Sequence, residues 1–532
     1  MIFNYLAYCR RSLRDVGIRA VFIHKSYSGA GYHRLPLQLR TNLILTRLRG
    51  LPSSKFTRPF SSSSNLNSGK MTVAIYPTKA SGYISSHKYP AKDHARAVAK
   101  HLSISNGTIF LESQKSRLEE DKDQEAPFHQ RRYFFYLTGC DLPNCYVTYD
   151  VSKDFLTLYI PPIDPEEVMW SGLPLDVKGA MEKFDIDSAK YSNELESDLV
   201  GEVLAIPDRV SERFALMKGG TTVVKASNDL KEAIDECRAY KDDYEVALIK
   251  HANEISGIAH EALMKAVKTC KTEFELEAIF LENCIKRGGR RQAYDTIVAS
   301  GTNAATLHYI KNNQAFGDRL NILIDGGCEY DTYASDITRV FPLNGKFSKE
   351  SKEIYSLVLK MQTVSLEMVK PGALWDTIHE TVHKILIEGF LELGIFQNGT
   401  VDEIFKNRTS CAFLPHGLGH FMGMDTHDTG GHPNYSDPDP MFKYLRVRIP
   451  LRERAVITVE PGCYFCEFII QPYLDDPKHN KYINQEVLKN YWSVGGVRIE
   501  DDVLVTKDGY ENLTNVVKEV ADVERMVNQD FQ

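Results

Sequence analysis

Three histidines and five glycines fall within residues 416–431, which read HGLGHFMGMDTHDTGG. Glycine adopts backbone conformations that other residues avoid and lets the chain pass close to a ligand. Histidine offers a nitrogen ligand, or a proton carrier that works near neutral pH. Such a stretch forms a site only if partner residues gather around it, and otherwise it only makes turns. The three candidates are His416, His420 and His427.

Four acidic residues in strand-like apolar runs are the partners that this stretch needs. Asp325 ends NILID, Glu460 ends VITVE and Glu500 ends GVRIE. Asp336 follows Asp325 by eleven residues, and the turn residues between them predict a hairpin that brings both acids together. A buried ionised carboxylate is costly unless it is paired or binds a cation. Singly, each acid could be a turn cap or a salt-bridge partner, but the four together predict a site.

Four carboxylates and one imidazole are suited to holding two divalent cations. Oxygen-rich ligands favour Mn²⁺, with Co²⁺ or Zn²⁺ as alternatives. Two metals roughly 3.5–4 Å apart can share a hydroxide and hold both the attacking oxygen and the carbonyl oxygen of a substrate. The pattern therefore predicts hydrolysis.

A second pattern competes for the metal. His379-Glu380-Thr-Val-His383 is an H-E-x-x-H motif on a predicted helix, the spacing at which two histidines bind one zinc, and Glu403 is a candidate third ligand. However, the histidines flank the apolar stripe of an ordinary amphipathic helix, and the motif leaves the four acids unexplained. We therefore interpret it as core packing.

Composition and charge narrow the function classes. Hydrophobic content is 43% and charged content 25% over 532 residues, as in ordinary globular proteins. Residues 1–70 hold 12 Lys/Arg and one acid, which leaves 52 basic and 70 acidic residues, a net charge of −18, in the rest. This negative charge on residues 71–532 argues against nucleic acid as a partner. No apolar run reaches the length of a membrane span.

The first 70 residues form a basic, serine-rich leader of the kind that targets proteins to mitochondria. The rival interpretation is an over-extended start, with Met71 beginning a cytoplasmic protein. We favour the cytoplasmic location because nothing after Met71 needs the leader. Ten cysteines without a paired framework fit a reducing compartment, and Cys463-x-x-Cys466 is interpreted as structural.

The remaining chain divides into an α/β N-terminal domain with its linker, residues 71–228, and a catalytic domain, residues 229–532. The first is expected to contain a helix at 91–102 and strands at 107–111, 132–137, 147–150 and 155–160, with a linker at 219–228. The second is expected to contain helices at 229–269, from 272 to 288, at 352–369 and at 375–393. Its expected strands are 294–300, 320–325, 335–341, 455–460, 496–500 and 502–506. Helices followed by strands, twice over, predict an α+β architecture with an internal pseudo-repeat.

Seven ordered motifs carry a likeness to a known family: SGTNAATLHY from Ser300, LIDGGCEY from Leu323, SDITR from Ser335, PHGLGH from Pro415, DTHD from Asp425, TVEPG from Thr458 and VRIEDD from Val497. Residues 240–515 resemble the pita-bread metallopeptidases, which include aminopeptidase P, prolidase and methionine aminopeptidase. RRYFFYLTGC, from Arg131, resembles the aminopeptidase P N-terminal domain, and the likeness is closest to fungal Xaa-Pro aminopeptidases of the prolidase branch. The segment 465–493 stands out as an insertion of unclear purpose.

The resemblance implies a role for each matched position. The metal ligands would be Asp325, Asp336, His420, Glu460 and Glu500, with Asp336 and Glu500 bridging two metals. Glu460 would also be the general base that takes a proton from the bridging water. His416 and His427 would hydrogen-bond the substrate and the developing oxyanion. His308 would line the proline-side pocket, and Arg498 would steady the site or the substrate carboxylate.

The implied activity is release of the N-terminal residue from peptides with proline in second position. A prolidase restricted to Xaa-Pro dipeptides is the alternative, because the two enzymes share their metal site. A binding protein that kept the fold and lost the metals is a third reading, but no acidic ligand is substituted. The resemblance further implies proline-containing peptides as substrates, and a homodimer or homotetramer.

Overall fold

The computed structural model describes residues 75–215 and 222–529. The leader predicted for residues 1–70 lies outside these described residues. Among the helices described, none combines the length and the apolarity that a membrane span requires.

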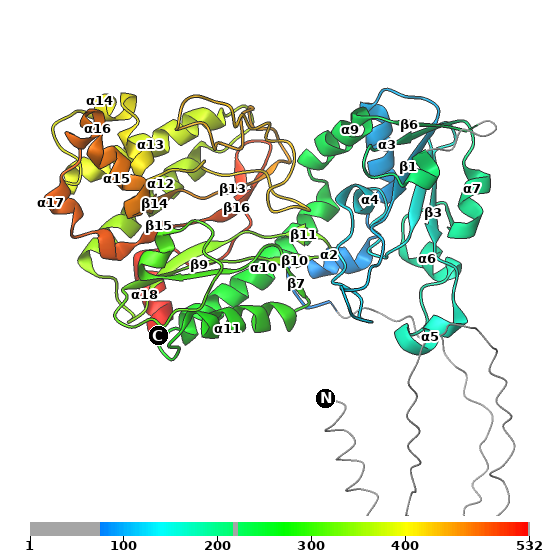
Figure 1. The fold of residues 1–532 in the computed structure, drawn as a ribbon, viewed down its shortest axis with the longest axis horizontal. Helices are drawn as coiled ribbons and strands as arrows, with labels where there is room; N and C mark the ends of the chain where they lie inside the picture. The colour runs from blue at the N-terminus through cyan, green and yellow to red at the C-terminus, as the bar shows by residue number, and fades with distance from the viewer. Residues whose placement is uncertain (1–74, 216–221, 530–532) are drawn as a thin grey trace, which may run out of the picture. The chain divides into compact units, whose positions relative to one another are not determined.

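The N-terminal domain is built on a six-stranded sheet with the order β4-β3-β2-β1-β5-β6. Strands β1, β2 and β3 form an antiparallel meander, and the three other neighbouring pairs are parallel. The strands are β1 (Thr108–Glu112), β2 (Tyr146–Asp150), β3 (Phe155–Ile160), β4 (Ser188–Tyr191), β5 (Glu202–Ala205) and β6 (Val223–Ala226). The helices are α2 (Ser81–Ser86), α3 (Ala91–His101), α4 (Arg132–Tyr136), α5 (Pro165–Ser171), α6 (Val177–Lys183), α7 (Leu195–Asp198) and α8 (Glu212–Ala215). The α/β organisation predicted for this part is confirmed (Figure 1).

Two local predictions in this part are wrong. The stretch 132–137, expected as a strand, forms the short helix α4, whose Phe134, Phe135 and Tyr136 are all buried. Aromatic residues favour strands, but this preference gives way where the surroundings bury several consecutive side chains. The expected linker at 219–228 contains β6, which pairs with β5 at the edge of the sheet.

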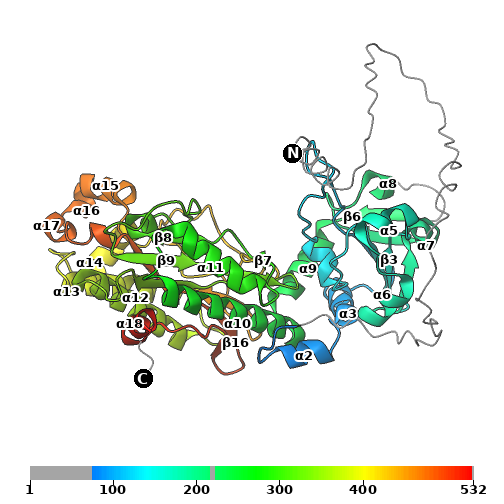
Figure 2. The same ribbon diagram turned by 90° about the horizontal axis from the view of Figure 1, so that it is seen from below.

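The first half of the catalytic domain consists of two long helices followed by strands. Helices α10 (Asp243–Ala266) and α11 (Glu273–Ile285) pack side by side (Figures 1 and 2). The predicted capping box of α11, formed by Thr272 and Glu275, is present. The long helix expected over 229–269 is instead two helices, α9 (Asn228–Ala239) and α10. The strands that follow are β7 (Arg291–Gln292), β8 (Ile297–Ser300), β9 (Asn321–Asp325), β10 (Cys328–Tyr330), β11 (Tyr333–Ala334) and β12 (Thr338–Pro342).

The second half repeats this order. Helices α12 (Lys349–Met368) and α13 (Trp375–Glu392) pack together, and strands close the domain. The strands are β13 (Val456–Val459), β14 (Gly462–Tyr464), β15 (Gly496–Arg498), β16 (Asp501–Val505) and β17 (Tyr510–Asn512), and the shorter helices are α14 (Val401–Lys406), α15 (Glu467–Asp475), α16 (Pro477–Asn480), α17 (Gln485–Leu488) and α18 (Val520–Asn528). Two helix pairs, each followed by acid-bearing strands, are the α+β pita-bread arrangement that the sequence predicts.

Candidate metal centre

Asp325 and Asp336 meet because their strands pair. Asp325 is the last residue of β9, which pairs antiparallel with β12 so that Thr338 lies opposite Asp325. Asp336 comes two residues before Thr338 and is therefore held next to Asp325, as the predicted hairpin requires. The connection between the strands contains its own small hairpin, β10–β11, which turns at Asp331 and Thr332.

Glu460 and Glu500 come from the second half of the domain. Glu460 follows β13, and its backbone N–H donates to the carbonyl of Leu418 at 2.9 Å. Glu500 lies between β15 and β16 and forms a single bridge with Thr338 of β12. The Thr338 hydroxyl donates to Glu500 Oε2 at 2.6 Å. This bridge joins the two halves at the acids.

The glycines beside His416 and His420 are there for close packing. A Cβ on Gly419 would lie 2.0 Å from the carbonyl oxygen of Thr458, and one on Gly417 would lie 2.6 Å from that of Tyr444. Because glycine has no Cβ, the chain at these two positions can run directly along β13. The Thr458 N–H donates to the His420 carbonyl at 2.9 Å, which fixes the imidazole beside the acids.

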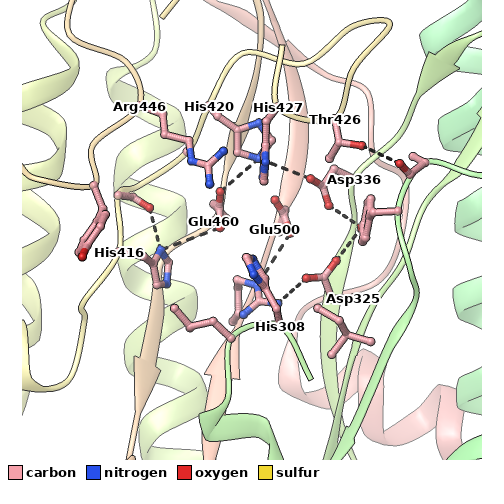
Figure 3. A pocket seen from close by; sticks show the side chains of 18 of the residues that line it. His308, Asp325, Asp336, His416, His420, Thr426, His427, Arg446, Glu460 and Glu500 are labelled. Atoms are coloured by element: carbon pink, nitrogen blue, oxygen red, sulfur yellow. Dashed lines mark hydrogen bonds and ion pairs between the residues drawn. The ribbon is translucent and has the colours of Figure 1, made fainter. Parts of the chain in front are cut away.

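One cavity of about 850 Å³ gathers every residue that the sequence predicts for the site. Ligand atoms of Asp336, His420 and Glu500 lie within 4.8 Å of one another. His420 Nε2 is 3.4 Å from Asp336 Oδ2 and 3.4 Å from Glu460 Oε1 (Figure 3). The predicted residues that line the cavity are His308, Asp325, Asp336, His416, His420, His427, Glu460, Arg498 and Glu500.

The centre carries more negative charge than its own residues can neutralise. Burial raises the pKa of Asp336 well above its ordinary value, and the charge of Asp325 raises it further. Burial does the same to Glu500, again with help from neighbouring carboxylates, and raises the pKa of Glu460 to about 7. The four carboxylates of the centre share this cavity with two guanidinium groups, those of Arg446 and Arg498. Crowded acids of this kind are stabilised by cations.

Tyr294, which the sequence reading missed, bridges two of the acids. Its hydroxyl lies 2.6 Å from Asp325 Oδ1 and 2.5 Å from Asp336 Oδ1. A phenol has one proton, so it can donate to only one of the two carboxylates at a time. Divalent cations would supply the missing positive charge, and the donor set of oxygens with one imidazole fits them.

Arg498 and Tyr464 connect the acids to His416. The Arg498 guanidinium is ion-paired with Asp325 and donates to the Tyr464 hydroxyl at 2.9 Å. The Tyr464 hydroxyl lies 2.8 Å from His416 Nε2, and His416 Nδ1 lies 2.8 Å from the carbonyl of Gly417. Since a carbonyl only accepts, Nδ1 carries the proton and Nε2 accepts from Tyr464. Burial lowers the pKa of His416 to about 3, so the ring is neutral.

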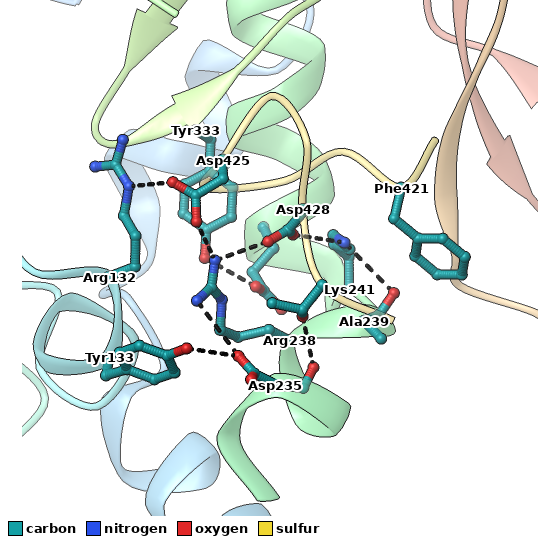
Figure 4. Close-up of polar contacts among 12 residues, drawn as sticks. Arg132, Tyr133, Asp235, Arg238, Ala239, Lys241, Tyr333, Phe421, Asp425 and Asp428 are labelled. Atoms are coloured by element: carbon teal, nitrogen blue, oxygen red, sulfur yellow. Dashed lines mark hydrogen bonds and ion pairs between the residues drawn. The ribbon is translucent and has the colours of Figure 1, made fainter. Parts of the chain in front are cut away.

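The segment that carries His427 is anchored through two acidic residues, one before and one after the histidine. Asp425 and Asp428 both accept from the buried guanidinium of Arg238, at 2.8 and 2.7 Å (Figure 4). Lys241 pairs with Asp428 at 3.2 Å. The His427 imidazole itself has no hydrogen bond to any described residue, and desolvation at the cavity wall, together with the charges of His420 and Arg446, lowers its pKa. It therefore presents a neutral ring to the cavity.

His308 and Arg446 also face the cavity. His308 lies on an exposed loop between β8 and β9, as the resemblance implies for a residue at the pocket wall. Arg446 is a second residue that the sequence reading missed, and within the described part of the chain its side chain has no ion pair or hydrogen bond. A partner-free guanidinium is a group that could receive a carboxylate. No short sequence motif surrounds Arg446, so the sequence gives no signal for it. Tyr464 had a weak signal, because it lies four residues after the predicted ligand Glu460, at the end of β14.

The H-E-x-x-H histidines lie elsewhere and are fully buried. His379 Nε2 is 2.8 Å from the carbonyl of Met441, and His383 Nδ1 is 2.8 Å from the Ser410 hydroxyl. Glu403 is occupied as part of the capping box of α14, with Thr400. In the described residues these histidines belong to no group of three metal-binding side chains. This arrangement agrees with the interpretation of the motif as core packing.

Comparisons with known proteins agree with this geometry. Residues 247–507 match the model of metallopeptidase family M24, and residues 92–205 match that of the aminopeptidase P N-terminal domain. A probable Xaa-Pro aminopeptidase of Tuber melanosporum is 54% identical over 449 residues, which are 83% of this chain and 97% of that protein. A probable Xaa-Pro aminopeptidase of Verticillium alfalfae is 54% identical over 451 residues, with the same coverage.

Solved structures show the same fold. Aminopeptidase P from Escherichia coli with the inhibitor Pro-Leu has a TM-score of 0.70 at 28% identity, covering 83% of this chain and 99% of that one. Aminopeptidase PepP of Pseudomonas aeruginosa has a TM-score of 0.68 at 30% identity, with the same coverage. This chain is therefore a member of metallopeptidase family M24, in the branch whose members carry the aminopeptidase P N-terminal domain.

Proposed function

We propose that this protein is an Xaa-Pro aminopeptidase, a metallo-exopeptidase that hydrolyses the bond between the first residue of a peptide and a proline in second position. The observation that carries the proposal is the buried cluster of four carboxylates and one imidazole, open to a cavity of about 850 Å³. The relatives named as Xaa-Pro aminopeptidases are similar over nearly their whole length, which supports the same activity here.

We infer that the cluster holds two divalent cations. Asp325, Asp336, His420, Glu460 and Glu500 would hold them, and Asp336, His420 and Glu500 offer ligand atoms within 4.8 Å of one another. Mn²⁺ fits a set dominated by oxygen donors, with Co²⁺ or Zn²⁺ as alternatives. When bound, the cations would polarise the scissile carbonyl and lower the pKa of water at the site.

Glu460 is the residue best placed to act as general base. Its side chain is 16% exposed, compared with 7% for Asp336 and 2% for Glu500. It therefore meets water more readily than those two acids. In the proposed reaction Glu460 accepts a proton from the attacking water and returns it to the leaving proline nitrogen.

His427 and His416 act on the substrate from opposite flanks. His427 is neutral and has a free ring, so its N–H can donate to the carbonyl oxygen on which negative charge develops. His416 already accepts from Tyr464, and a substrate that binds on this flank would exchange that bond for one of its own. Arg498 keeps Tyr464 and Asp325 in place, and His308 covers the proline side.

The cavity favours an aminopeptidase over a dipeptide-only prolidase. Its volume is near the upper end of the range for small-molecule sites, and several wall residues are exposed. A peptide can therefore extend out of it. Arg446 lies on the wall and is suited to a C-terminal carboxylate if the peptide is short.

The test is hydrolysis of Ala-Pro and Ala-Pro-Gly by metal-stripped protein before and after Mn²⁺ is added back. We expect Mn²⁺ to restore cleavage of the Ala–Pro bond in the tripeptide. Cleavage of the dipeptide alone would establish a prolidase. If neither is cleaved, although metal analysis finds two Mn²⁺ per chain, the peptidase proposal is wrong. Recovery of full activity with one Mn²⁺ per chain would contradict the two-metal site.

A further inference from the structure

The mouth of the cavity has an unusual number of exposed apolar side chains. Ile310, Tyr435 and Tyr444 all line the cavity, yet are 53%, 55% and 51% exposed. Large apolar groups left half in water next to a binding site are candidates for contact with a ligand. Tyr444 also carries the Lys443 ammonium over its ring, 5.4 Å from the ring centroid.

Helix α15 adds a fourth apolar group to this rim. It belongs to the segment 465–493, the insertion whose purpose the sequence leaves open. Ile470 is fully buried and anchors the helix, while the neighbouring Ile469 is half-buried and lines the cavity. Phe468, the residue before Ile469, is 88% exposed and does not line the cavity. Ile469 therefore faces the cavity, whereas Phe468 faces solvent.

Tyr444 and Ile469 lie on the same flank, that of His416. The Tyr444 carbonyl packs against Gly417, which follows His416 directly. The N–H of Tyr464, five residues before Ile469, donates to the carbonyl of Phe413 at 2.8 Å, which brings the start of α15 to this flank. Both residues line the cavity, and these backbone contacts bring them to the flank of His416, which is labelled on the left of Figure 3.

The opposite flank, around Thr426, is acidic. Asp425 and the exposed Asp295 both line the cavity. Asp425 precedes Thr426, which Figure 3 labels, and the Thr426 hydroxyl donates to the carbonyl of Ala293, two residues before Asp295, at 3.3 Å. Because Asp425 is paired with Arg132 and Arg238, the unpaired charge of this flank, among the described residues, is that of Asp295. A peptide with a free N-terminus carries a positive charge at its first residue, which favours this acidic flank. With the scissile carbonyl at the metal ligands between the flanks, the residues after proline leave along the His416 flank.

We propose that Tyr444 and Ile469 form an apolar subsite for the side chain of the third residue of the substrate. The protein would then prefer Xaa-Pro-Yaa peptides in which Yaa is aromatic or aliphatic. This inference rests on the proposed peptidase function and names the substrate class of that site. It also gives the inserted helix α15 a purpose, since α15 brings Ile469 to the cavity wall.

The test compares Ala-Pro-Phe, Ala-Pro-Gly and Ala-Pro-Asp. For the unaltered protein we expect kcat/KM for Ala-Pro-Phe to exceed that for Ala-Pro-Gly about 10-fold, and Ala-Pro-Asp to be the poorest substrate. In Ile469→Ser and in Tyr444→Ser, the Phe-to-Gly ratio should fall to about 3 or below. Phe468→Ser is the matched control on the same helix, and its ratio should stay at the unaltered value.

The ratio within each variant cancels any general loss of activity, so partial unfolding cannot imitate the result. A Phe-to-Gly ratio near one in the unaltered protein contradicts the subsite, and so does a ratio that survives both substitutions. A ratio that falls equally in Phe468→Ser shows that the helix, and not Ile469, is responsible, and overturns the assignment. Failure of the proposed function is distinguishable, because then Ala-Pro-Gly itself is not cleaved by the Mn²⁺-loaded protein.

Discussion

Arg132, on helix α4 of the N-terminal domain, donates to Asp425 Oδ1 at 3.0 Å, and Asp425 lies two residues before His427 (Figure 4). The same guanidinium donates to Glu329 Oε2 at 2.9 Å. A residue outside the catalytic fold thus contacts the segment that carries His427. Because Asp425 is also bound by Arg238, the backbone before His427 is held from two sides. The N-terminal domain therefore takes part in shaping the centre.

Replacing Arg132 should impair catalysis more than substrate binding. In Arg132→Met the His427 segment loses one of its two anchors, and we expect kcat for Ala-Pro-Gly to fall about 10-fold with a smaller change in KM. Steady-state kinetics measures this split, and thermal unfolding reports the accompanying loss of stability. Arg132→Lys keeps one donor and should recover part of kcat.

Arg131 offers a matched control, because it lies next to Arg132 but donates to the backbone carbonyls of Glu112 and Arg209. Arg131→Met should leave kcat within about twofold of the unaltered protein. If Arg132→Met lowers the melting temperature but leaves kcat unchanged, the contact serves stability alone and the positioning role is wrong.

Glu460→Gln should abolish hydrolysis, while Glu380→Gln should not. The first variant removes the proposed base, and such losses commonly reach 10²–10⁴-fold in rate. The second changes the glutamate of the H-E-x-x-H motif, whose histidines are bound to Met441 and Ser410 in the core. Measured kcat/KM of both variants, with circular dichroism to check folding, decides between the two candidate sites. A folded but inactive Glu380→Gln would reverse the assignment.

The acidic residues of the centre could be predicted because the sequence places charged side chains at the ends of apolar, strand-like runs. A carboxylate at the end of an apolar run needs a cation or a partner, so Asp325, Glu460 and Glu500 stand out without any structure. Tyr294 and Arg446 do not stand out, because a tyrosine or an arginine is compatible with most surroundings. Their part in the centre comes from the packing of distant segments, which no local pattern records.

The errors in the fold have similar causes. Helix α4 was expected as a strand because its aromatic residues favour strands, and only their burial in the domain overrides that preference. The break between α9 and α10 did leave a local signal. Asp242 caps α10 and forms a capping box with Glu245, a spacing that indicates a helix start within an otherwise continuous apolar pattern.

Tyr464→Phe should lower kcat with little loss of stability. The hydroxyl accepts from Arg498 and donates to His416, so its removal frees His416 to turn and leaves Nε2 without its donor. We expect a decrease of about 10-fold in kcat, measured on Ala-Pro-Gly. Tyr491→Phe is a control, because its hydroxyl donates to Glu353 at 2.8 Å and not to a residue of the site. Equal kinetics in the two variants would remove Tyr464 from the proposed mechanism.

His94 should make the stability of the fold depend on pH. Burial lowers the pKa of His94, but the hydrogen bond with Asp242 at 2.8 Å and the charge of Glu245 outweigh burial, and the net pKa is raised above 6.5. The folded protein therefore favours the protonated ring. This contribution is fully present below pH 6.5 and is lost as the pH rises through the raised pKa.

The measurement is the melting temperature of the unaltered protein and of His94→Gln at pH 5.5 and pH 9. The deficit of the variant should be larger at pH 5.5, where the unaltered protein has the charged pair. His251 supplies a control of opposite sign, because burial lowers its pKa to about 4. Between that value and 6.5 the unfolded chain binds more protons, so the stability that neutral His251 contributes rises with pH. The deficit of His251→Gln should therefore be larger at pH 9. A deficit of His94→Gln that is equal at both pH values would mean that the fold does not raise the pKa of His94. A deficit that is larger at pH 9 would mean that the ring is neutral in the fold and that Asp242 binds it through an uncharged hydrogen bond.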